Sequence, residues 1–261
     1  MPATDGAWLS LLASATGIAI AAGLVVGIRE FFQLRSQRLL DRIAYREMRL
    51  SLMQIPPNGL AAYLFAPFWA GIYLAAGTLT SAELPLNIFI VLAAFAAADF
   101  SYYWEHRCAH KLPFLWAAYH GVHHTSGAYT VATAYRVSFV NHFFAPAFYL
   151  PWILLGFDPL LIGAMQLFVF HYQAWVHTET IGELRWLDGW LNTPANHRMH
   201  HSSAVAHRDR NFGGVLMCWD RLFGSYVRPE RNVAFGVHGH VPPDGMKEVF
   251  LQPLRGLLPR H

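Results

Sequence analysis

The chain has 261 residues, of which 54% are hydrophobic and only 13% are charged. A soluble domain carries about 25% charged residues, so this composition favours a membrane protein. The net charge of +3 gives no indication of nucleic-acid binding, and Cys108 and Cys218 form no CxxC pair, which argues against a disulfide framework or an iron–sulfur site.

Three apolar runs divide the first hundred residues. Residues 8–28 form a run of the length that a membrane-spanning helix needs. No basic segment precedes this run and no clear cleavage site follows it, so we expect a retained helix and not a signal peptide. Residues 59–80 and 86–104 are the second and third predicted spans, and the short polar turn 81–85 separates them.

Residues 29–50, between the first two spans, interleave six arginines with large apolar side chains. This pattern predicts an amphipathic helix that lies on the membrane surface. The alternative is a solvated linker helix, which the phenylalanines of this segment disfavour.

The second half of the chain contains another apolar pair. Residues 139–155 and 160–175 flank a Gly-Phe-Asp-Pro sequence at 156–159, which is a turn signal. Residues 178–261 are more polar and rich in glycine and proline, so we expect them to form an extramembrane cap.

The predicted fold is therefore all-α, a multi-pass bundle of four to five membrane spans with a cytoplasmic helical cap. Two regions are expected. Residues 1–104 hold membrane helices and the interfacial helix, and residues 105–261 hold the catalytic region with the helical hairpin 139–176.

Charge placement predicts the orientation. The arginine-rich segment 29–49 is expected on the cytoplasmic side, and the connections 81–85 and 156–159, which lack lysine and arginine, on the other side. The histidine-rich segments 105–125 and 177–207 then both emerge on the cytoplasmic face.

Eight histidines form three clusters. One HxxxH motif and two HxxHH motifs contain His106, His110, His120, His123, His124, His197, His200 and His201. In a helix, residues three or four apart share a face, so each motif presents imidazoles in one direction. Neutral imidazole suits iron, copper, nickel and zinc. Eight ligands exceed the needs of one tetrahedral zinc ion and suit two metals with open positions for oxygen.

The surrounding motifs resemble the fatty acid hydroxylase/sterol desaturase superfamily of integral-membrane di-iron enzymes, over roughly residues 90–228. Besides the three histidine clusters, the matching segments are Trp175-Val176-His177-Thr178-Glu179, Asn192-Thr193-Pro194, Asn211-Phe212-Gly213-Gly214 and Trp219-Asp220-Arg221-Leu222-Phe223-Gly224.

This resemblance implies that the eight clustered histidines, with His177 as a ninth, bind two ferrous ions. It implies a membrane-bound non-haem oxygenase that uses O2 to hydroxylate an unactivated C–H bond of a lipid, such as a fatty acyl chain or a sterol. The chain has no GxGxxG, CxxCH or CxxC motif. Electrons are therefore expected from a separate electron-transfer protein. The residues Tyr135-Arg136 look closer to the alkylglycerol monooxygenase-like branch of the superfamily, and in that branch a pterin would supply the electrons.

Alternative functions use the same histidines. A lipid desaturase or an alkylglycerol-type ether-lipid monooxygenase would keep the site and change the product. A non-catalytic metal transporter is a distant alternative, because the runs 8–28 and 59–80 carry no charged residues at mid-depth. A zinc hydrolase is disfavoured because HExxH is absent. The C-terminal Pro259-Arg260-His261 is no retention signal, which fits a bacterial inner membrane.

Other polar residues have two interpretations each. His142 and His171 lie in apolar runs, where we favour a hydrogen bond to a neighbouring helix over a functional role. His207 is near the cluster in sequence, and a role as an outer partner of the cluster is the less favoured interpretation for it. His238, His240 and His261 are expected at the surface. Asp99 either orients a metal-bound imidazole or holds helices together. The same two interpretations apply to Glu105, Glu179 and Asp188.

Overall fold

The computed structural model describes residues 3–37, 41–82 and 84–255, with side chains for residue 10 and from residue 13 onward. Regular structure in these ranges is helical apart from two isolated β-bridges, Leu191 with Leu216 and Ser202 with Phe235. The all-α prediction is therefore confirmed. The prediction of a bacterial inner membrane used the C-terminal residues 259–261, which lie outside the described residues.

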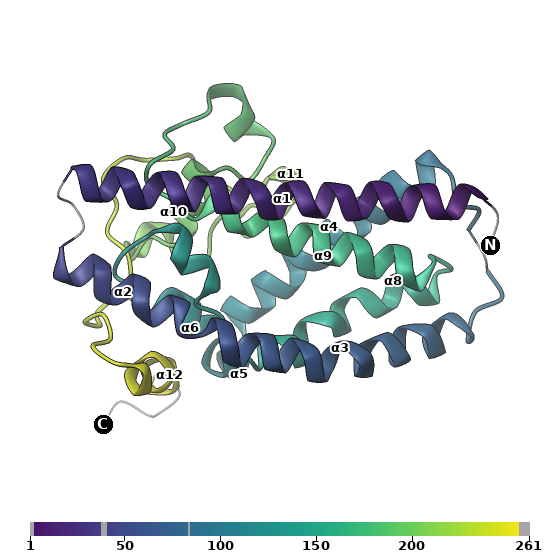
Figure 1. Ribbon diagram of the computed structural model, residues 1–261, viewed down its shortest axis with the longest axis horizontal. Coiled ribbons are helices and arrows are strands. Elements are labelled where there is room, and N and C mark those ends of the chain that lie inside the picture. Colours follow the sequence, from purple (N-terminus) through teal and green to yellow (C-terminus); the bar gives the residue numbers. More distant parts are fainter. Residues whose placement is uncertain (1–2, 38–40, 83, 256–261) are drawn as a thin grey trace.

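Four long helices form the body of the molecule: α1 (Ala3–Ser36), α3 (Ile55–Gly77), α4 (Ile88–Lys111) and α9 (Pro159–Val176). Figure 1 shows them running roughly along the long axis, and α9 packs against both α1 and α4. The turn before α4 and the start of α1 lie at one end of the molecule. The histidine motifs lie at the other end.

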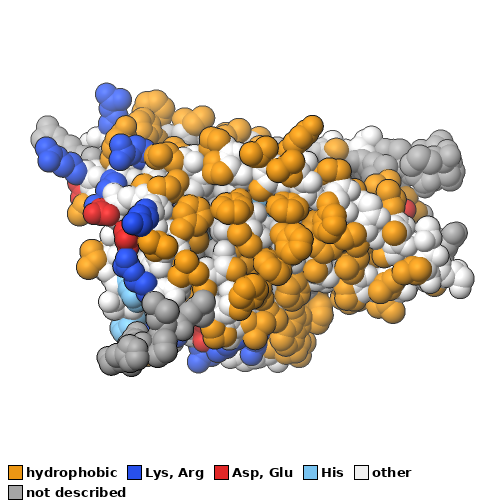
Figure 2. Space-filling model, turned by 90° about the horizontal axis from the view of Figure 1, so that it is seen from below, with side chains coloured by type: hydrophobic (Ala, Val, Ile, Leu, Met, Phe, Trp, Pro, Cys, Tyr) orange, Lys and Arg blue, Asp and Glu red, His pale blue; other side chains and the backbone are white. Residues whose placement is uncertain are grey.

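Three helical segments are long and apolar enough to cross a membrane, namely Ala13–Ser36, Arg42–Gly77 and Ile88–Lys111. Their outward side chains are apolar, for example Val25 at 65% exposure and Leu60 at 60%. Figure 2 shows a broad apolar surface, with lysine and arginine gathered toward one end. The chain is thus a membrane protein with three candidate spans, where the sequence predicted four to five.

The predicted interfacial helix 29–50 is two helices. Helix α1 continues to Ser36 because its apolar pattern passes through Phe31 and Phe32 without a helix breaker. A new helix, α2 (Arg42–Leu52), begins after Asp41, whose carboxylate caps it by accepting a hydrogen bond from the Ala44 amide at 2.7 Å. Helix α2 is amphipathic as predicted, and it leads almost directly into α3.

The predicted span 139–155 is not one helix. It consists of α7 (Asn141–Phe144), the 3₁₀ helix η3 (Ala145–Tyr149) and α8 (Leu150–Leu154). Pro146 and Pro151 lack the amide hydrogens that a continuous helix would need, so the α-helical register is interrupted. Its partner α9 begins at Pro159, where Asp158 caps the first turn. The turn between them is where the sequence predicted it.

Short elements and loops surround the histidine motifs. They are α5 (Pro113–Leu115), the π-helix η1 (Trp116–His120), α6 (Gly121–His124), η2 (Val131–Tyr135), η4 (Arg185–Gly189), α10 (Pro194–His200), η5 (Val205–His207), α11 (Cys218–Leu222) and α12 (Met246–Arg255). The region after Val176 is thus mostly loop with short helices, because its glycines and prolines limit helix length. The predicted helical cap is therefore less helical in the structure than the sequence analysis expected.

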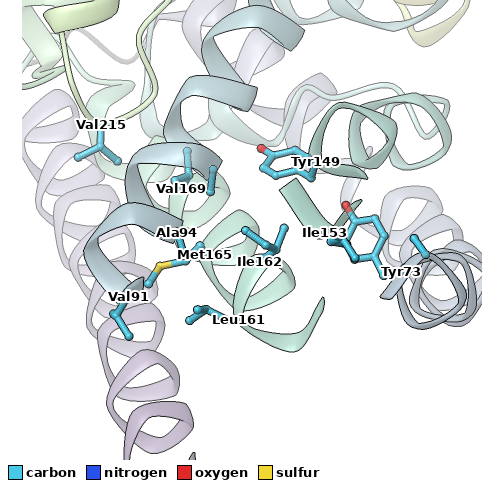
Figure 3. Close-up of a cluster of buried hydrophobic side chains, with 12 residues drawn as sticks. Tyr73, Val91, Ala94, Tyr149, Ile153, Leu161, Ile162, Met165, Val169 and Val215 are labelled. Atoms are coloured by element: carbon cyan, nitrogen blue, oxygen red, sulfur yellow. The ribbon is translucent and has the colours of Figure 1, made fainter. Parts of the chain in front are cut away.

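One apolar core holds α4, α8 and α9 together. Figure 3 shows Ala94 of α4 beside Met165 and Ile162 of α9, with Ile153 of α8 on the other side. Val215, from the loop before α11, closes the cluster at the histidine end. This core fixes the end of α4 and the end of α9 next to each other, which is where both helices deliver histidines.

Candidate metal centre

Helix α4 carries His106 and His110 on one face in its last turns. The helix begins at Asn87, whose side chain accepts hydrogen bonds from the amides of Phe89 and Ile90. Both histidines are four residues apart, so their rings project side by side, with ring centroids 5.4 Å apart.

The two HxxHH motifs are also helical. His120 ends η1, and His123 and His124 lie in α6. Helix α10 starts at Pro194, and Thr193 caps it by accepting a hydrogen bond from the Asn196 amide. His197 and His200 lie in α10, and His201 is its C-cap.

The nine predicted ligands converge into two groups. In each group the candidate ligand atoms lie within 4.8 Å of one another. The first group contains His106, His110, His120, His124 and His200, and the second contains His123, His177, His197 and His201. The structure thus brings together all nine histidines named from the sequence.

Each HxxHH motif contributes to both groups. His120 and His124, four residues apart, belong to the first group, while His123 belongs to the second. In the last motif the division is reversed: the pair four apart, His197 and His201, belongs to the second group and His200 to the first. Neighbours on a helix differ by about 100° in direction, so one short helix can serve two sites.

Backbone carbonyls fix the orientation of four of these rings. The Nδ1 atoms of His106, His123, His177 and His200 lie 2.9, 3.2, 2.6 and 2.9 Å from the carbonyl oxygens of Phe212, Arg136, Gln173 and Arg210. A carbonyl can only accept, so each Nδ1 carries the hydrogen and each Nε2 carries a lone pair. That tautomer is the one in which Nε2 binds a metal.

The Nε2 atoms face one another. The Nε2 atoms of His123 and His177 lie 3.0 Å apart, although both have their hydrogen on Nδ1. Two neutral acceptors cannot form a hydrogen bond, so this arrangement needs a cation between or beside them. His201 Nε2 is buried and has no hydrogen-bond partner among the residues that the structure describes. Buried polar atoms left in this way are rare, and a role as a metal ligand accounts for this one.

The spacing also fits the donor set of a metal. Several Nε2 pairs are 3.0–3.2 Å apart, including His106 with His120 and His124 with His200. An imidazole nitrogen lies about 2.1 Å from a bound zinc ion. If the distance to iron is similar, two nitrogens bound at right angles to each other lie about 3.0 Å apart. This spacing suits a five- or six-coordinate site better than a tetrahedral one, and the first group offers five candidate ligands.

Burial keeps these imidazoles neutral. It lowers the pKa of His177 to about 4, although the hydrogen bond to the Gln173 carbonyl opposes the shift. Burial, together with the neighbouring histidines, holds the pKa of His120, His124, His197 and His201 well below the usual value. Neutral imidazole is the metal-binding form, so the site is ready to bind cations near neutral pH.

Asp99 does not touch an imidazole. Its carboxylate accepts hydrogen bonds from the amides of Val215 and Leu216, at 2.6 and 3.1 Å, and from Trp219 Nε1 at 2.9 Å. Of the two interpretations, the structure therefore favours the one in which Asp99 holds structural elements together. It anchors the loop that carries the Phe212 carbonyl, so it supports His106 indirectly.

Two buried residues of the helices before α4 also support the site, and the sequence did not single them out. Glu30 of α1 is 2% exposed and accepts hydrogen bonds from the Val131 amide and the Thr178 hydroxyl, next to His177. Glu47 of α2 is 1% exposed and lies 2.8 Å from Arg136, which is fully buried.

The other histidines in the described part of the chain lie outside the two groups. His142 contacts Asn58 Oδ1 on α3 at 3.2 Å, and His171 contacts its own helix at the Leu167 carbonyl. The hydrogen bond that we favoured to a neighbouring helix is therefore found for His142 and not for His171. His207 contacts Ser202 Oγ at 2.9 Å and Glu230 at 3.5 Å.

The other acidic residues near the motifs act on local structure. Glu105 accepts a hydrogen bond from the Tyr119 hydroxyl at 2.7 Å. Asp188 accepts from the Leu184 amide at 2.8 Å and from the Thr193 hydroxyl, so it braces the start of α10. Burial raises the pKa of Glu179, and Arg198 opposes that shift.

Comparison with known proteins places the site in a family region. The family model described as fatty acid hydroxylase matches residues 91–225. This range runs from the first turn of α4 to just beyond α11 and contains every histidine of the two groups. No solved structure matches the chain with significance.

Three relatives illustrate the range of related chemistry. Alkylglycerol monooxygenase from Xenopus tropicalis is 40% identical over 143 residues, which are 55% of this chain and 32% of that protein. An ornithine lipid hydroxylase from Rhizobium tropici is 33% identical over 159 residues, 59% of this chain and 47% of that protein. A Delta(7)-sterol 5(6)-desaturase from Aspergillus fumigatus is 31% identical over 157 residues, 59% and 44% respectively. The matched region thus spans about a third of the alkylglycerol monooxygenase.

Proposed function

Because the chain belongs to the fatty acid hydroxylase family, we propose that it is a membrane-bound oxygenase that uses two iron ions and O2 to hydroxylate a C–H bond of a lipid. The observation that carries this proposal is the pair of histidine groups, whose ring nitrogens converge from four separate segments of the chain. Three helices that are long and apolar enough to cross a membrane support a lipid substrate.

The histidines divide into two sets of ligands under this proposal. The first group would hold one iron ion and the second group the other. When bound, the two ions supply the O2 activation that an unactivated C–H bond requires.

The chain itself fixes the ligand positions. Carbonyls of Phe212, Arg136, Gln173 and Arg210 fix four rings in one tautomer, so the nitrogens point inward before any metal arrives. Pre-organisation of this kind lowers the cost of ordering ligands on binding. Phe212 is fully buried, and its ring centroid lies 5.2 Å from that of His110, so it helps to exclude water from the first group.

A second candidate function is oxidation of an ether lipid. The supporting observation is the 40% identity to alkylglycerol monooxygenase, higher than to the lipid hydroxylase or the sterol desaturase. Product analysis separates the possibilities: an aldehyde released from an alkylglycerol indicates ether oxidation, a stable alcohol indicates hydroxylation, and a new double bond indicates desaturation.

The source of electrons is part of the proposal. We propose a separate electron-transfer protein, or a pterin if the ether-lipid activity holds. Turnover of the purified protein with each reductant alone, at matched reducing equivalents, distinguishes the two.

We further propose that the metal groups lie at the cytoplasmic face. The arginine-rich segment 29–49 ends at α2, and Figures 1 and 2 show the histidine motifs and the basic residues toward the same end of the molecule. Relatives of this chain occur both in an animal, Xenopus tropicalis, and in a bacterium, Rhizobium tropici. The location in a bacterial inner membrane therefore stays a prediction.

The test combines metal content and turnover of the full chain purified in detergent. We expect two iron ions per chain and O2-dependent oxidation of lipid. The variant His200→Ala should lose iron and activity together, while His238→Ala, on the exposed surface, should keep both. Full activity of His200→Ala would contradict the proposal, and metal transport into proteoliposomes without oxidation would favour a transporter.

A further inference from the structure

We propose that a basic pocket beside the first histidine group is the docking site for an acidic electron-transfer protein, an inference that rests on the proposed function. The pocket has a volume of about 240 Å³ and is lined by Arg107, Lys111, Arg208, Asp209, Arg210, Gly224 and Ser225. Four of these residues are cationic and one is acidic.

The charge in the pocket is only partly neutralised, because Arg107 has the buried Asp220 as an acidic neighbour and Lys111 has Asp209, whereas the pocket holds four cations. Asp209 is paired with Lys111 at 2.6 Å, and Arg107 and Arg210 donate to the backbone carbonyls of Phe223 and Gly224. A carbonyl oxygen does not cancel a guanidinium charge. Within the described part of the chain, the exposed Arg208 guanidinium has no ion-pair partner. A net positive pocket of this kind attracts a partner with an acidic face.

The pocket contacts the candidate ligands directly. Asp209 Oδ1 lies 3.7 Å from His110 Nδ1, and the Arg210 carbonyl accepts the hydrogen bond from His200 Nδ1. Arg107 follows His106 in the sequence, and Lys111 follows His110. A partner bound here is therefore separated from the first histidine group by single side chains.

The two histidine groups also differ in exposure. His110 and His120 of the first group are only partly buried, whereas all four members of the second group are buried. Electrons supplied from outside reach the first group by the shortest route. We therefore assign electron entry to this group.

The backbone of the pocket is built for a fixed shape. Asp209 and Asn211 have positive φ values of 60° and 53°, which few residues other than glycine adopt. Asn211 is buried, and its amide nitrogen donates to the carbonyls of Asn196 and Val227. The loop therefore holds the cations around the pocket while its carbonyl orients His200.

The partner's chemistry follows from these features. It is a small protein with an acidic surface and a one-electron carrier near that surface. Association driven by charge is faster than neutral association by about 10- to 1,000-fold and weakens as salt rises.

The experiment measures reduction of the oxidised, iron-loaded full chain in nanodiscs of neutral lipid. One reductant is a plant-type [2Fe–2S] ferredoxin, which is small and acidic. The other is the methyl viologen radical cation, which needs no docking surface. We compare the wild type, Arg208→Glu and a charge-matched control, Arg42→Glu, at an exposed position outside the pocket.

We expect the ferredoxin rate constant to fall steeply with ionic strength. In Arg208→Glu, the ratio of the ferredoxin rate to the viologen rate should fall at least about tenfold, while Arg42→Glu should keep the wild-type ratio. An unchanged ratio in Arg208→Glu would overturn the docking role. An equal loss with both reductants would overturn it too, because the change would then act on the metal groups.

Two further outcomes are decisive. If phosphatidylglycerol in the nanodisc removes the effect of Arg208→Glu, the pocket binds anionic lipid headgroups and the inference fails. If the chain holds iron and oxidises lipid with viologen but ignores ferredoxin, the docking inference fails and the proposed function stands. A chain that binds no iron contradicts both.

Discussion

At the residue scale, the site depends on which nitrogen of each ring carries hydrogen. His177 illustrates this, because its Nδ1 lies 2.6 Å from the Gln173 carbonyl one turn earlier in α9, so Nε2 faces the second group. The helix that delivers the ligand thus also fixes its tautomer.

Removal of His177 should affect one group only. The second group would keep His123, His197 and His201, while the first group would keep all its members. We expect iron in His177→Ala to fall from two ions per chain toward one, measured by mass spectrometry of the metal. His171→Ala, a histidine of the same helix outside both groups, is the control, and two ions in His177→Ala would exclude it as a ligand.

Arg136 and Glu47 form a buried ion pair that connects α2 to the segment after His124. Arg136 also donates to Ser51 Oγ, Thr125 Oγ1 and the Glu47 carbonyl, so the guanidinium is well satisfied. Loss of one partner leaves a buried charge alone, which typically costs about 3–5 kcal/mol.

Arg136→Met should therefore lower the unfolding temperature markedly in detergent. The double variant Glu47→Gln with Arg136→Met should recover part of the loss, because neither charge remains buried alone. The single variant Glu47→Gln completes the comparison. If the loss of stability in the double variant equals the sum of the losses in the two single variants, the two charges do not act as a pair.

At the element scale, α1 completes the site although it lies outside the matched family region. It packs along α9, and Glu30 reaches from it to Val131 and Thr178. A Cβ atom on Gly23 would lie 2.8 Å from the Cβ of Ala174 in α9, so only glycine allows this approach of the two helices.

Gly23→Leu should separate α1 from α9. Overpacking at such a contact costs about 1–3 kcal/mol, and displaced Glu30 would release the turn after His177. We expect a lower unfolding temperature and a partial loss of iron from the second group. Gly17→Leu is the matched control, since nothing lies within 4 Å of its added Cβ; equal effects of both substitutions would contradict this account.

At the scale of the whole molecule, metal and protons compete for the same nitrogens. Burial lowers the pKa of His177 to about 4 in the folded chain. Between that value and the ordinary histidine pKa of about 6.5, the unfolded chain binds more protons than the folded chain. The metal-free protein should therefore lose stability as pH falls from about 6.5 to about 4.

Thermal unfolding of chelated protein across this pH range measures the effect. Each such histidine contributes up to about 1.4 kcal/mol per pH unit within the window. Added ferrous iron should raise the unfolding temperature near neutral pH, because it binds the folded chain only. A pH-independent unfolding temperature of the metal-free protein would show that the imidazoles are not held neutral.

The ninth histidine, His177, was named only from the resemblance to the family, whereas the sequence by itself determined the helical class, the membrane character and the eight clustered histidines. These follow from local rules: apolar runs long enough to span, and imidazoles at helical spacing. Two predicted elements were wrong: prolines interrupt the helix expected over 139–155, and a new helix begins after Asp41 within the segment 29–50. Both are local sequence features that a prediction from hydropathy alone does not include.

Only the tertiary structure decided how the histidines divide. A helix turns about 100° per residue, so His123 and His124 must point apart, but which group each joins depends on how α4, α6, α9 and α10 pack. Glu30, the Arg136–Glu47 pair and the basic pocket likewise join residues far apart in the chain, and their partners are set by the packed helices and loops.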